Sequence, residues 1–284
     1  MVGHDRGAVT PSAVRQLAER LDELGWVTEL LVAGSLATGD YVPGVSDLDL
    51  VALTGGPVGP ARQEILAGLH RELDQGAAQG LDLGCVYVDS GRLTDLGALH
   101  PTWTHGSLVQ RSLSGVTRAE LVRYGFAVLG RPPAAVLPEM TDDDVRRAAR
   151  AELCGYWAHA ARRPRWWLNP VIADLGLTSM ARGRHALQTG QLLTKTEAIE
   201  QAHAPAWLKD QLRARRQGQL VPSPRTRTAL IAWRDARRTV ANACRGAPGR
   251  KSLRVAQGET SLVVSRLLDL VGECDGKVCV RKVG

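Results

Sequence analysis

Two carboxylates lie inside an apolar stretch of the N-terminal half of this chain. The segment LLVAGSLATGDYVPGVSDLDLVAL, residues 30–53, runs through Gly34 and Ser35 into a loop, and then into a second apolar run that carries Asp47 and Asp49. Both apolar runs are bounded by turn residues, as buried strands are. An ionised carboxylate in such a strand must be paired or bound to a metal, because its desolvation otherwise costs several kcal/mol. The segment therefore predicts a strand–loop–strand unit built around a charged site.

The spacing of the acids indicates what they bind. Side chains alternate along a strand, so Asp47 and Asp49 project from one face, roughly 6 to 7 Å apart along the chain. Asp82 begins another apolar strand, LDLGCVYV, and could add a third carboxylate to that face. Clusters of oxygen ligands suit Mg²⁺, which usually completes its shell with waters and substrate phosphates. A nucleoside triphosphate is the implied partner.

The Gly-Ser turn fits the same partner. Gly34 leaves no side chain between the backbone and a phosphate, while Ser35 offers a hydroxyl and its turn offers amide donors. Ser46 could add another hydroxyl directly before the acids. Taken singly, Gly-Ser is an ordinary turn and Asp-x-Asp an exposed edge strand. Together, at this spacing and between apolar strands, they predict a nucleotide site.

The chain has two differently patterned halves. Strands are predicted at residues 27–34, 48–53 and 81–88, with amphipathic helices before and between them. From about Thr117 onward the patterns are helical. Adjacent prolines in GRPPAAVLPEM mark the junction, since they cannot continue a helix. We predict an α+β protein with domains at residues 1–133 and 134–284, the second all-helical. Its helices are expected at 118–130, 142–160, 170–190, 195–202, 205–216, 227–243 and 259–271.

Composition limits the class of protein. The net charge of +7 arises from basic residues in the C-terminal part, which favours solvated helix faces but leaves attraction of RNA or nucleotide phosphates open. No apolar run approaches the ~20 residues of a membrane span, and the N-terminus lacks the apolar centre of a signal peptide. We expect a cytoplasmic monomer that does not enter a membrane. The scattered cysteines predict free thiols rather than disulfides or zinc: Cys85, Cys154, Cys244, Cys274 and Cys279.

The Gly-Ser turn and the Asp-x-Asp strand resemble the nucleotidyltransferase family related to polymerase beta. Together with residues 81–88 and 175–200, they look like the streptomycin and spectinomycin adenylyltransferases. The resemblance implies a nucleotidyltransferase domain, a mixed sheet with flanking helices, followed by a helical domain that completes the nucleotide and acceptor sites. It also implies that Asp47 and Asp49 bind magnesium and that the third acid, Asp82, joins the metal site and deprotonates the acceptor hydroxyl. The family typically has glutamate at the third place, one methylene longer than Asp82.

Two basic residues of the helical half extend the resemblance. Arg182 and Lys195 match positions where similar enzymes bind the triphosphate. Thr194 and Glu197 form a T-x-x-E capping box, so Lys195 is expected in a first helical turn, where a phosphate would be favourable. An ordinary exposed lysine is the alternative.

The resemblance implies transfer of AMP from ATP to a hydroxyl of an aminoglycoside-type antibiotic, similar to streptomycin or spectinomycin, which would give resistance. Candidate residues for this cationic small-molecule acceptor are Trp103, Glu152 and Asp174. The segment AHAARRPRWWLNP, residues 158–170, is strongly basic and unsuited to such a drug. Two alternatives therefore stay open: the same chemistry on a metabolite, RNA or protein, and a non-catalytic module that binds nucleotides or nucleic acid.

Overall fold

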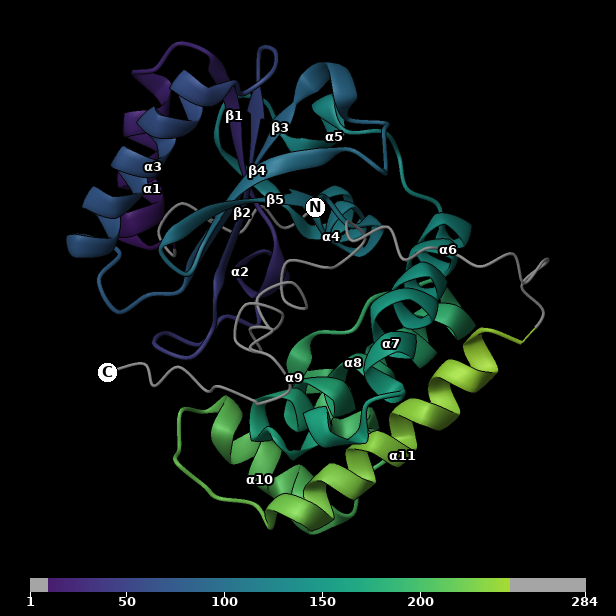
Figure 1. Ribbon diagram of the computed structural model, residues 1–284. Coiled ribbons are helices and arrows are strands. Elements are labelled where there is room, and N and C mark those ends of the chain that lie inside the picture. The colour runs from purple at the N-terminus through teal and green to yellow at the C-terminus, as the bar shows by residue number, and fades with distance from the viewer. Residues whose placement is uncertain (1–9, 246–284) are drawn as a thin grey trace. The chain divides into compact units, whose positions relative to one another are not determined.

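The computed structural model describes residues 10–245, which form two compact units (Figure 1). Unit 1 contains residues 10–111 and 120–139, and unit 2 contains residues 112–119 and 140–245. Helix α4 (Gly115–Tyr124) therefore contributes to both units. The predicted boundary was between residues 133 and 134, whereas the structure has it between 139 and 140 and adds a short earlier segment to unit 2. The helix predicted at 259–271 lies outside the described residues.

Unit 1 is built on a six-stranded mixed sheet with the strand order β5-β4-β3-β2-β1-β6. Strands β2 and β3 are parallel, whereas β1 runs antiparallel to both β2 and β6, and β4 runs antiparallel to β3. The strands are β1 (Val27–Val32), β2 (Leu48–Thr54), β3 (Leu83–Asp89), β4 (Leu99–Thr104), β5 (Ser107–Ser112) and β6 (Phe126–Leu129).

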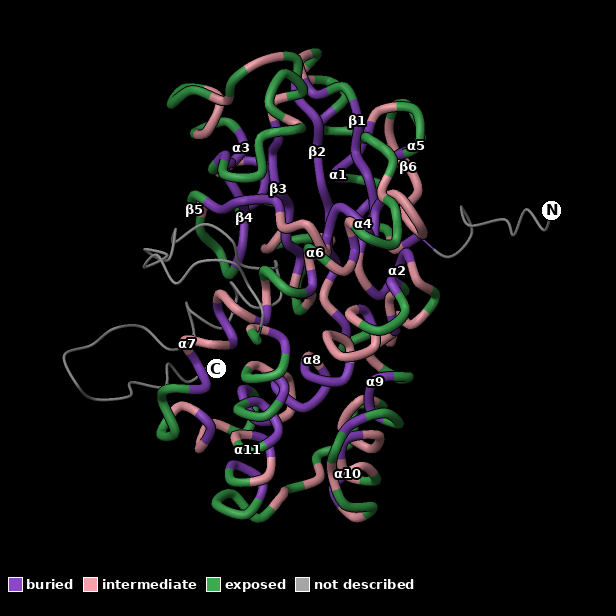
Figure 2. Tube along the Cα trace, turned by 90° about the vertical axis from the view of Figure 1, so that its right-hand side faces the viewer, coloured by how far each residue is buried: buried purple, intermediate pink, exposed green. Residues whose placement is uncertain are grey.

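One face of this sheet packs against helices α1 (Ser12–Asp22) and α3 (Pro60–Gln75). The inward side chains of β2, Leu48, Leu50 and Ala52, belong to this core. Because side chains alternate along a strand, Asp49 projects from the opposite face. Figure 2 shows β2 buried along its length. The remaining helices of unit 1 are short: α2 (Gly34–Thr38), the 3₁₀ turn η2 (Ser90–Arg92) and α5 (Pro133–Val136).

The prediction of a helix at residues 118–130 was wrong for residues 125–130. Helix α4 ends at Tyr124, and β6 pairs with β1 through Phe126. Gly125 separates the two elements and lies so close to the preceding turn that an added Cβ would meet the Leu121 carbonyl oxygen at 2.4 Å. A four-residue apolar run carries no periodicity that distinguishes helix from strand, so the free edge of β1 decides its conformation.

Between residues 140 and 245, the regular secondary structure of unit 2 is helical, as predicted. Its elements are α6 (Asp142–Glu152), the π-helical turn η3 (Leu153–Trp157), α7 (Ala158–Ala161), the 3₁₀ segment η4 (Pro164–Leu168), α8 (Pro170–Thr189), α9 (Lys195–Gln201), α10 (Ala206–Arg216) and α11 (Arg225–Ala243). Trp157, Trp167 and Met180 are fully buried in its core. Among residues 10–245, no helix combines the length and the apolar character needed to cross a bilayer.

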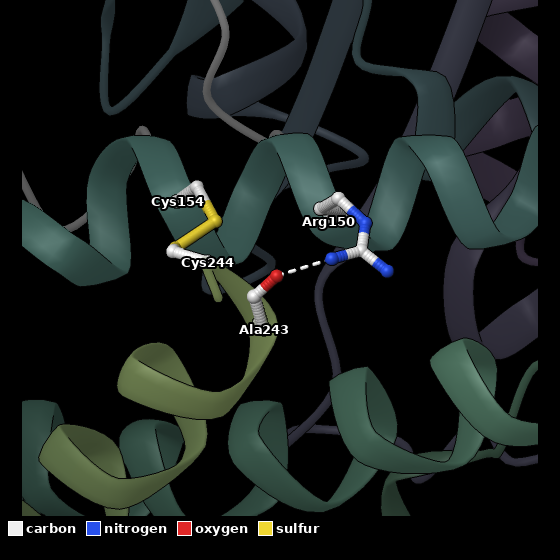
Figure 3. Close-up of a disulfide and its surroundings, with 4 residues drawn as sticks. All are labelled: Arg150, Cys154, Ala243 and Cys244. Carbon is white, nitrogen blue, oxygen red and sulfur yellow. Dashed lines mark hydrogen bonds between the residues drawn. A yellow bond between two sulfur atoms is a disulfide. The ribbon is translucent and has the colours of Figure 1, made fainter. Parts of the chain in front are cut away.

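The expectation of free thiols was wrong for one pair of cysteines. Cys154 in η3 and Cys244 after α11 form a disulfide, with their Cα atoms 5.8 Å apart (Figure 3). Beside it, the Arg150 guanidinium donates a hydrogen bond to the Ala243 carbonyl. The two cysteines are 90 residues apart in sequence, so only the packing of η3 against α11 brings them together. Cys85 is a buried free thiol, and Cys274 and Cys279 lie outside the described residues.

Candidate active site

The turn after β1 places its backbone directly against a motif carboxylate. Gly34 has φ = +61°, a conformation that favours glycine, and a Cβ added there would meet Asp49 Oδ2 at 2.3 Å. The preceding residue, Ala33, donates its amide hydrogen to the Asp49 carbonyl at 2.8 Å. Glycine is therefore required at position 34 for two reasons, its backbone conformation and the space that the carboxylate occupies.

Ser35 supplies a buried hydroxyl to the same turn. The residue is 7% exposed, and its Oγ has no hydrogen-bond partner among the described residues. Its carbonyl accepts the amide hydrogen of Asp40 at 2.9 Å, which holds the turn closed. Buried hydroxyls nearly always have partners, so the unpaired hydroxyl of the residue after Gly34 suits a polar ligand such as a phosphate oxygen.

The three predicted acids lie at the start of neighbouring parallel strands. Asp49 is 5% exposed on β2, and Asp47 directly precedes that strand. The Leu48 amide donates to the Asp82 carbonyl at 2.8 Å, so Asp82 lies beside the start of β2. Among residues 10–245, however, no three Asp, Glu, His or Cys side chains come close enough to form a metal site. The structure thus places the acids on adjacent strands without gathering them into one three-carboxylate cluster.

Asp82 instead has a neighbour that the sequence analysis missed. His105 Nδ1 lies 3.8 Å from Asp82 Oδ1. His105 and Gly106, with φ of +46° and +73°, form the two-residue turn between β4 and β5. The signal for this hairpin was present in TWTHGSL, where a residue followed by glycine separates two short strands. His105 therefore joins the candidate site through its contact with Asp82.

The charge of Asp82 also affects a second carboxyl group, that of Asp74. Burial raises the pKa of the Asp74 carboxyl, a hydrogen bond from Trp103 Nε1 at 3.2 Å lowers it, and the charge of Asp82 raises it. Asp82 therefore lies in an electrostatic environment shared with Asp74 and His105.

The donor set of the turn fits magnesium bound with a nucleotide. Asp47 and Asp49 offer hard carboxylate oxygens, and Gly34 and Ser35 offer an open backbone and a hydroxyl beside them. Ser46, predicted to bind nucleotide, has a local role as well: its Oγ accepts the Val42 amide hydrogen at 2.9 Å and shapes the loop that leads into Asp47.

Unit 2 brings two predicted residues together. Glu152 and Arg182 line one pocket, whose apolar wall includes Trp157. Arg182 Nε donates to the Leu193 carbonyl at 2.9 Å, which fixes the direction of its side chain. Trp157 Nε1 is buried and has no hydrogen-bond partner among the described residues. The pocket thus combines a carboxylate and a guanidinium with an apolar wall.

Lys195 is the first residue of α9, and the predicted capping box of that helix is confirmed. The Thr194 side chain accepts from the Glu197 amide, and the Glu197 carboxylate accepts from the Thr194 amide. Lys195 consequently lies where a helix presents unpaired amide hydrogens.

The other two acceptor candidates have structural partners. Trp103 is 2% exposed and stacks on His70 within the core of unit 1, with a centroid distance of 5.0 Å. Asp174 is held by both Arg215 Nε at 2.6 Å and Arg215 Nη2 at 2.9 Å. Burial raises the pKa of the Asp174 carboxyl, and the Arg215 guanidinium partly offsets this increase. Trp103 and Asp174 thus serve the packing of their units, whereas Glu152 stays a candidate because it lines the pocket of unit 2.

Comparison with known proteins places these features in a family context. The family model of the nucleotidyltransferase domain matches residues 14–86, which include the Gly-Ser turn and all three acids. No curated protein matches the chain. Among solved structures, the spectinomycin adenyltransferase AAD(9) from Enterococcus faecialis, determined with ATP and spectinomycin, has 16% sequence identity and a TM-score of 0.60. That match covers 80% of this chain and 96% of the other. The chain therefore carries the domain of an enzyme of the nucleotidyltransferase type, in a fold that it shares with an adenyltransferase.

Proposed function

We propose that this protein transfers AMP from ATP to a hydroxyl of an aminoglycoside-type antibiotic, with Mg²⁺, and so confers resistance. The observation that carries the proposal is the contact between the Gly34 backbone and the Asp49 carboxylate, together with the buried, unpaired hydroxyl of the next residue, Ser35. This arrangement offers a phosphate a close approach to the backbone, a hydroxyl donor and an adjacent metal-binding carboxylate. The fold shared with a spectinomycin adenyltransferase supports the choice of acceptor.

The three acids divide two roles between them in the proposed mechanism. Asp47 and Asp49 would hold Mg²⁺, which neutralises charge on the phosphates when bound. Asp82 accepts the proton of the acceptor hydroxyl, and His105 Nδ1 lies 3.8 Å from its carboxylate. The deprotonated oxygen attacks the α-phosphorus of ATP, the new P–O bond forms, and the bond to pyrophosphate breaks.

Residues of unit 2 complete the proposal. Arg182 and Lys195 are proposed to bind phosphate oxygens, Arg182 through the planar donors of its guanidinium and Lys195 as a compact positive charge at the start of α9. Glu152 is proposed to bind an ammonium group of the acceptor, because a carboxylate in a partly apolar pocket favours a cation.

Incubation of the full chain with α-labelled ATP, Mg²⁺ and a panel of aminoglycosides tests the proposal directly. We expect streptomycin or spectinomycin to gain the mass of one adenylyl group, with release of pyrophosphate. The matched control for the variant Asp49→Asn is Asp95→Asn, which removes a carboxylate from an exposed turn where Asp95 pairs with Arg92. Transfer should persist in this variant.

Two further outcomes separate the parts of the proposal. Pyrophosphate release that depends on Mg²⁺ but adenylylates no aminoglycoside would refute the drug acceptor and leave nucleotidyl transfer standing. If the protein neither binds ATP nor releases pyrophosphate under any condition, the proposed enzymatic activity is refuted.

A further inference from the structure

The exposed side of α11 carries a stripe of arginines. Arg227, Arg234 and Arg238 are spaced by seven and four residues, which places them on one face of the helix. The opposite face of α11, including Ala232 and Ala236, is buried in the core of unit 2. Figure 2 shows this alternation of exposed and buried positions along α11. The arginines therefore face outward from unit 2.

A second basic segment packs beside this helix. Arg162 and Arg163 are exposed between α7 and η4. Trp233 Nε1 of α11 donates to the Ala161 carbonyl at 2.9 Å, and Arg225 Nε donates to the Leu168 carbonyl at 2.6 Å. These hydrogen bonds fix the segment against α11 from both ends. We define the arginine face by its six members: Arg162, Arg163, Arg227, Arg234, Arg237 and Arg238.

The two segments that form this face contain almost no acidic residues. Residues 158–170 contain no Asp or Glu, and residues 225–245 contain only Asp235. Asp235 is 4% exposed, and its carboxylate accepts a hydrogen bond from Arg184 at 2.7 Å on the inner side of α11. Surface arginines usually occur among carboxylates that offset their charge. A face of one sign, built on two adjoining segments, indicates a polyanionic partner.

Tryptophans lie beneath three of the guanidinium groups. Arg163 lies over Trp166 at 5.0 Å, and Arg227 and Arg237 lie over Trp207 and Trp233, each at 4.9 Å. Contact with an indole ring restricts these long side chains, and each guanidinium keeps its planar set of donors. A guanidinium held in this way can stack on a nucleobase and also donate paired hydrogen bonds to phosphate oxygens.

We infer that the arginine face binds RNA through unpaired nucleotides. Unpaired bases can leave their own stack and lie on aromatic or guanidinium planes, whereas those of duplex DNA are covered by their neighbours. A membrane surface fits less well, because a membrane-bound helix inserts its apolar side and that side of α11 is already buried in unit 2. An acidic protein would use the charge but not the stacked planar groups.

Fluorescence anisotropy with a labelled single-stranded RNA of mixed sequence tests this inference. The test variant combines Arg227→Gln, Arg234→Gln and Arg238→Gln, which keep side-chain length and helix propensity. The matched control combines Arg20→Gln, Arg71→Gln and Arg92→Gln, which remove the same charge from exposed positions of unit 1. We expect the affinity for RNA to weaken at least about tenfold in the test variant and to change little in the control. The slope of log affinity against log salt concentration should indicate the release of roughly two fewer counterions in the test variant.

The competing partners have their own outcomes. Equal loss of affinity in both variants would show a non-specific effect of net charge and overturn the inference. Binding to duplex DNA as tight as to RNA, or to phosphatidylglycerol vesicles but not to RNA, would overturn it as well. If both variants unfold at the same temperature as the wild type, a loss of RNA binding does not result from a loss of folded protein.

Discussion

Gly34 is the residue whose identity the structure constrains most. Its backbone conformation disfavours other residues, and any side chain would displace the Asp49 carboxylate. Gly39 provides a contrast five residues later, because it also has a positive φ, +76°, but has open space around the position of a Cβ. The two glycines therefore separate backbone strain from displacement of the carboxylate.

Replacing Gly34 with alanine should lower adenylyl transfer by about 100-fold or more, since a shift of about 1 Å in a catalytic group has that effect. Gly39→Ala should destabilise its turn by about 1 kcal/mol through backbone strain alone, yet retain most of the activity. Steady-state kinetics combined with thermal unfolding distinguishes the two. If Gly34→Ala and Gly39→Ala have equal activity, the contact between Gly34 and Asp49 does not contribute to catalysis.

Asp49→Asn tests the metal assignment at the same scale. The amide has the size of the carboxylate but no charge, so Mg²⁺ affinity and transfer should fall together while the fold persists. Titration of Mg²⁺ against the transfer rate measures the first effect, and circular dichroism checks the fold. If the variant works at close to the wild-type rate with the same Mg²⁺ requirement, Asp49 does not bind the metal.

At the scale of elements, the sequence predicted what depends on local pattern. The strands around residues 30–53 and 81–88 could be recognised because turns and apolar runs alternate there, and the capping box at Thr194 because its two members are three residues apart. The Gly-Ser turn was identified for the same reason. Each of these signals lies within a few residues.

Features that depend on distant contacts could not be predicted. Strand β6 exists because β1 offers an edge, and Trp103 is a core residue because β4 places it over His70. The neighbour of Asp82, His105, comes from a hairpin that the sequence analysis did not assign. The pairing of Cys154 with Cys244 likewise depends on tertiary packing alone.

The packing of α3 on the sheet should depend on pH through His70. The His70 ring is fully buried, with Nε2 2.7 Å from the Tyr87 hydroxyl, and burial lowers the pKa of His70 from 6.5 to about 3. The unfolded chain therefore binds a proton below pH 6.5 that the folded protein does not accept until about pH 3. The free energy of unfolding consequently falls as the pH decreases through this window.

Urea unfolding at pH 7 and pH 5 measures this effect. Between pH 7 and pH 5, the free energy of unfolding of the wild-type protein should fall by about 2 kcal/mol more than that of His70→Gln. Glutamine can form a hydrogen bond with Tyr87 but does not titrate. An identical pH dependence in both proteins would assign the acid sensitivity to other groups.

At the scale of the whole molecule, each of the two units has its own main hydrophobic core, and the disulfide found among residues 10–245 lies in unit 2. The core of unit 1 joins α1 and α3 to the sheet, whereas that of unit 2 is formed by helices whose ends lie far apart in sequence. The disulfide connects η3 to the end of α11 and so closes a long segment of unit 2. Its contribution to stability should therefore be confined to unit 2.

Removing the link with Cys154→Ser and Cys244→Ser should lower the free energy of unfolding of unit 2 by about 3 kcal/mol, because the unfolded chain gains freedom when the loop is opened. Dithiothreitol should lower the stability of the wild type by a similar amount and leave the double variant unchanged. Cys85→Ala is the control, since this buried free thiol takes no part in the link, and the variant should keep its response to dithiothreitol. Tryptophan fluorescence monitors unit 2 because Trp157 and Trp167 lie in its core. If dithiothreitol changes the unfolding of the double variant as much as that of the wild type, the link between Cys154 and Cys244 does not stabilise the protein.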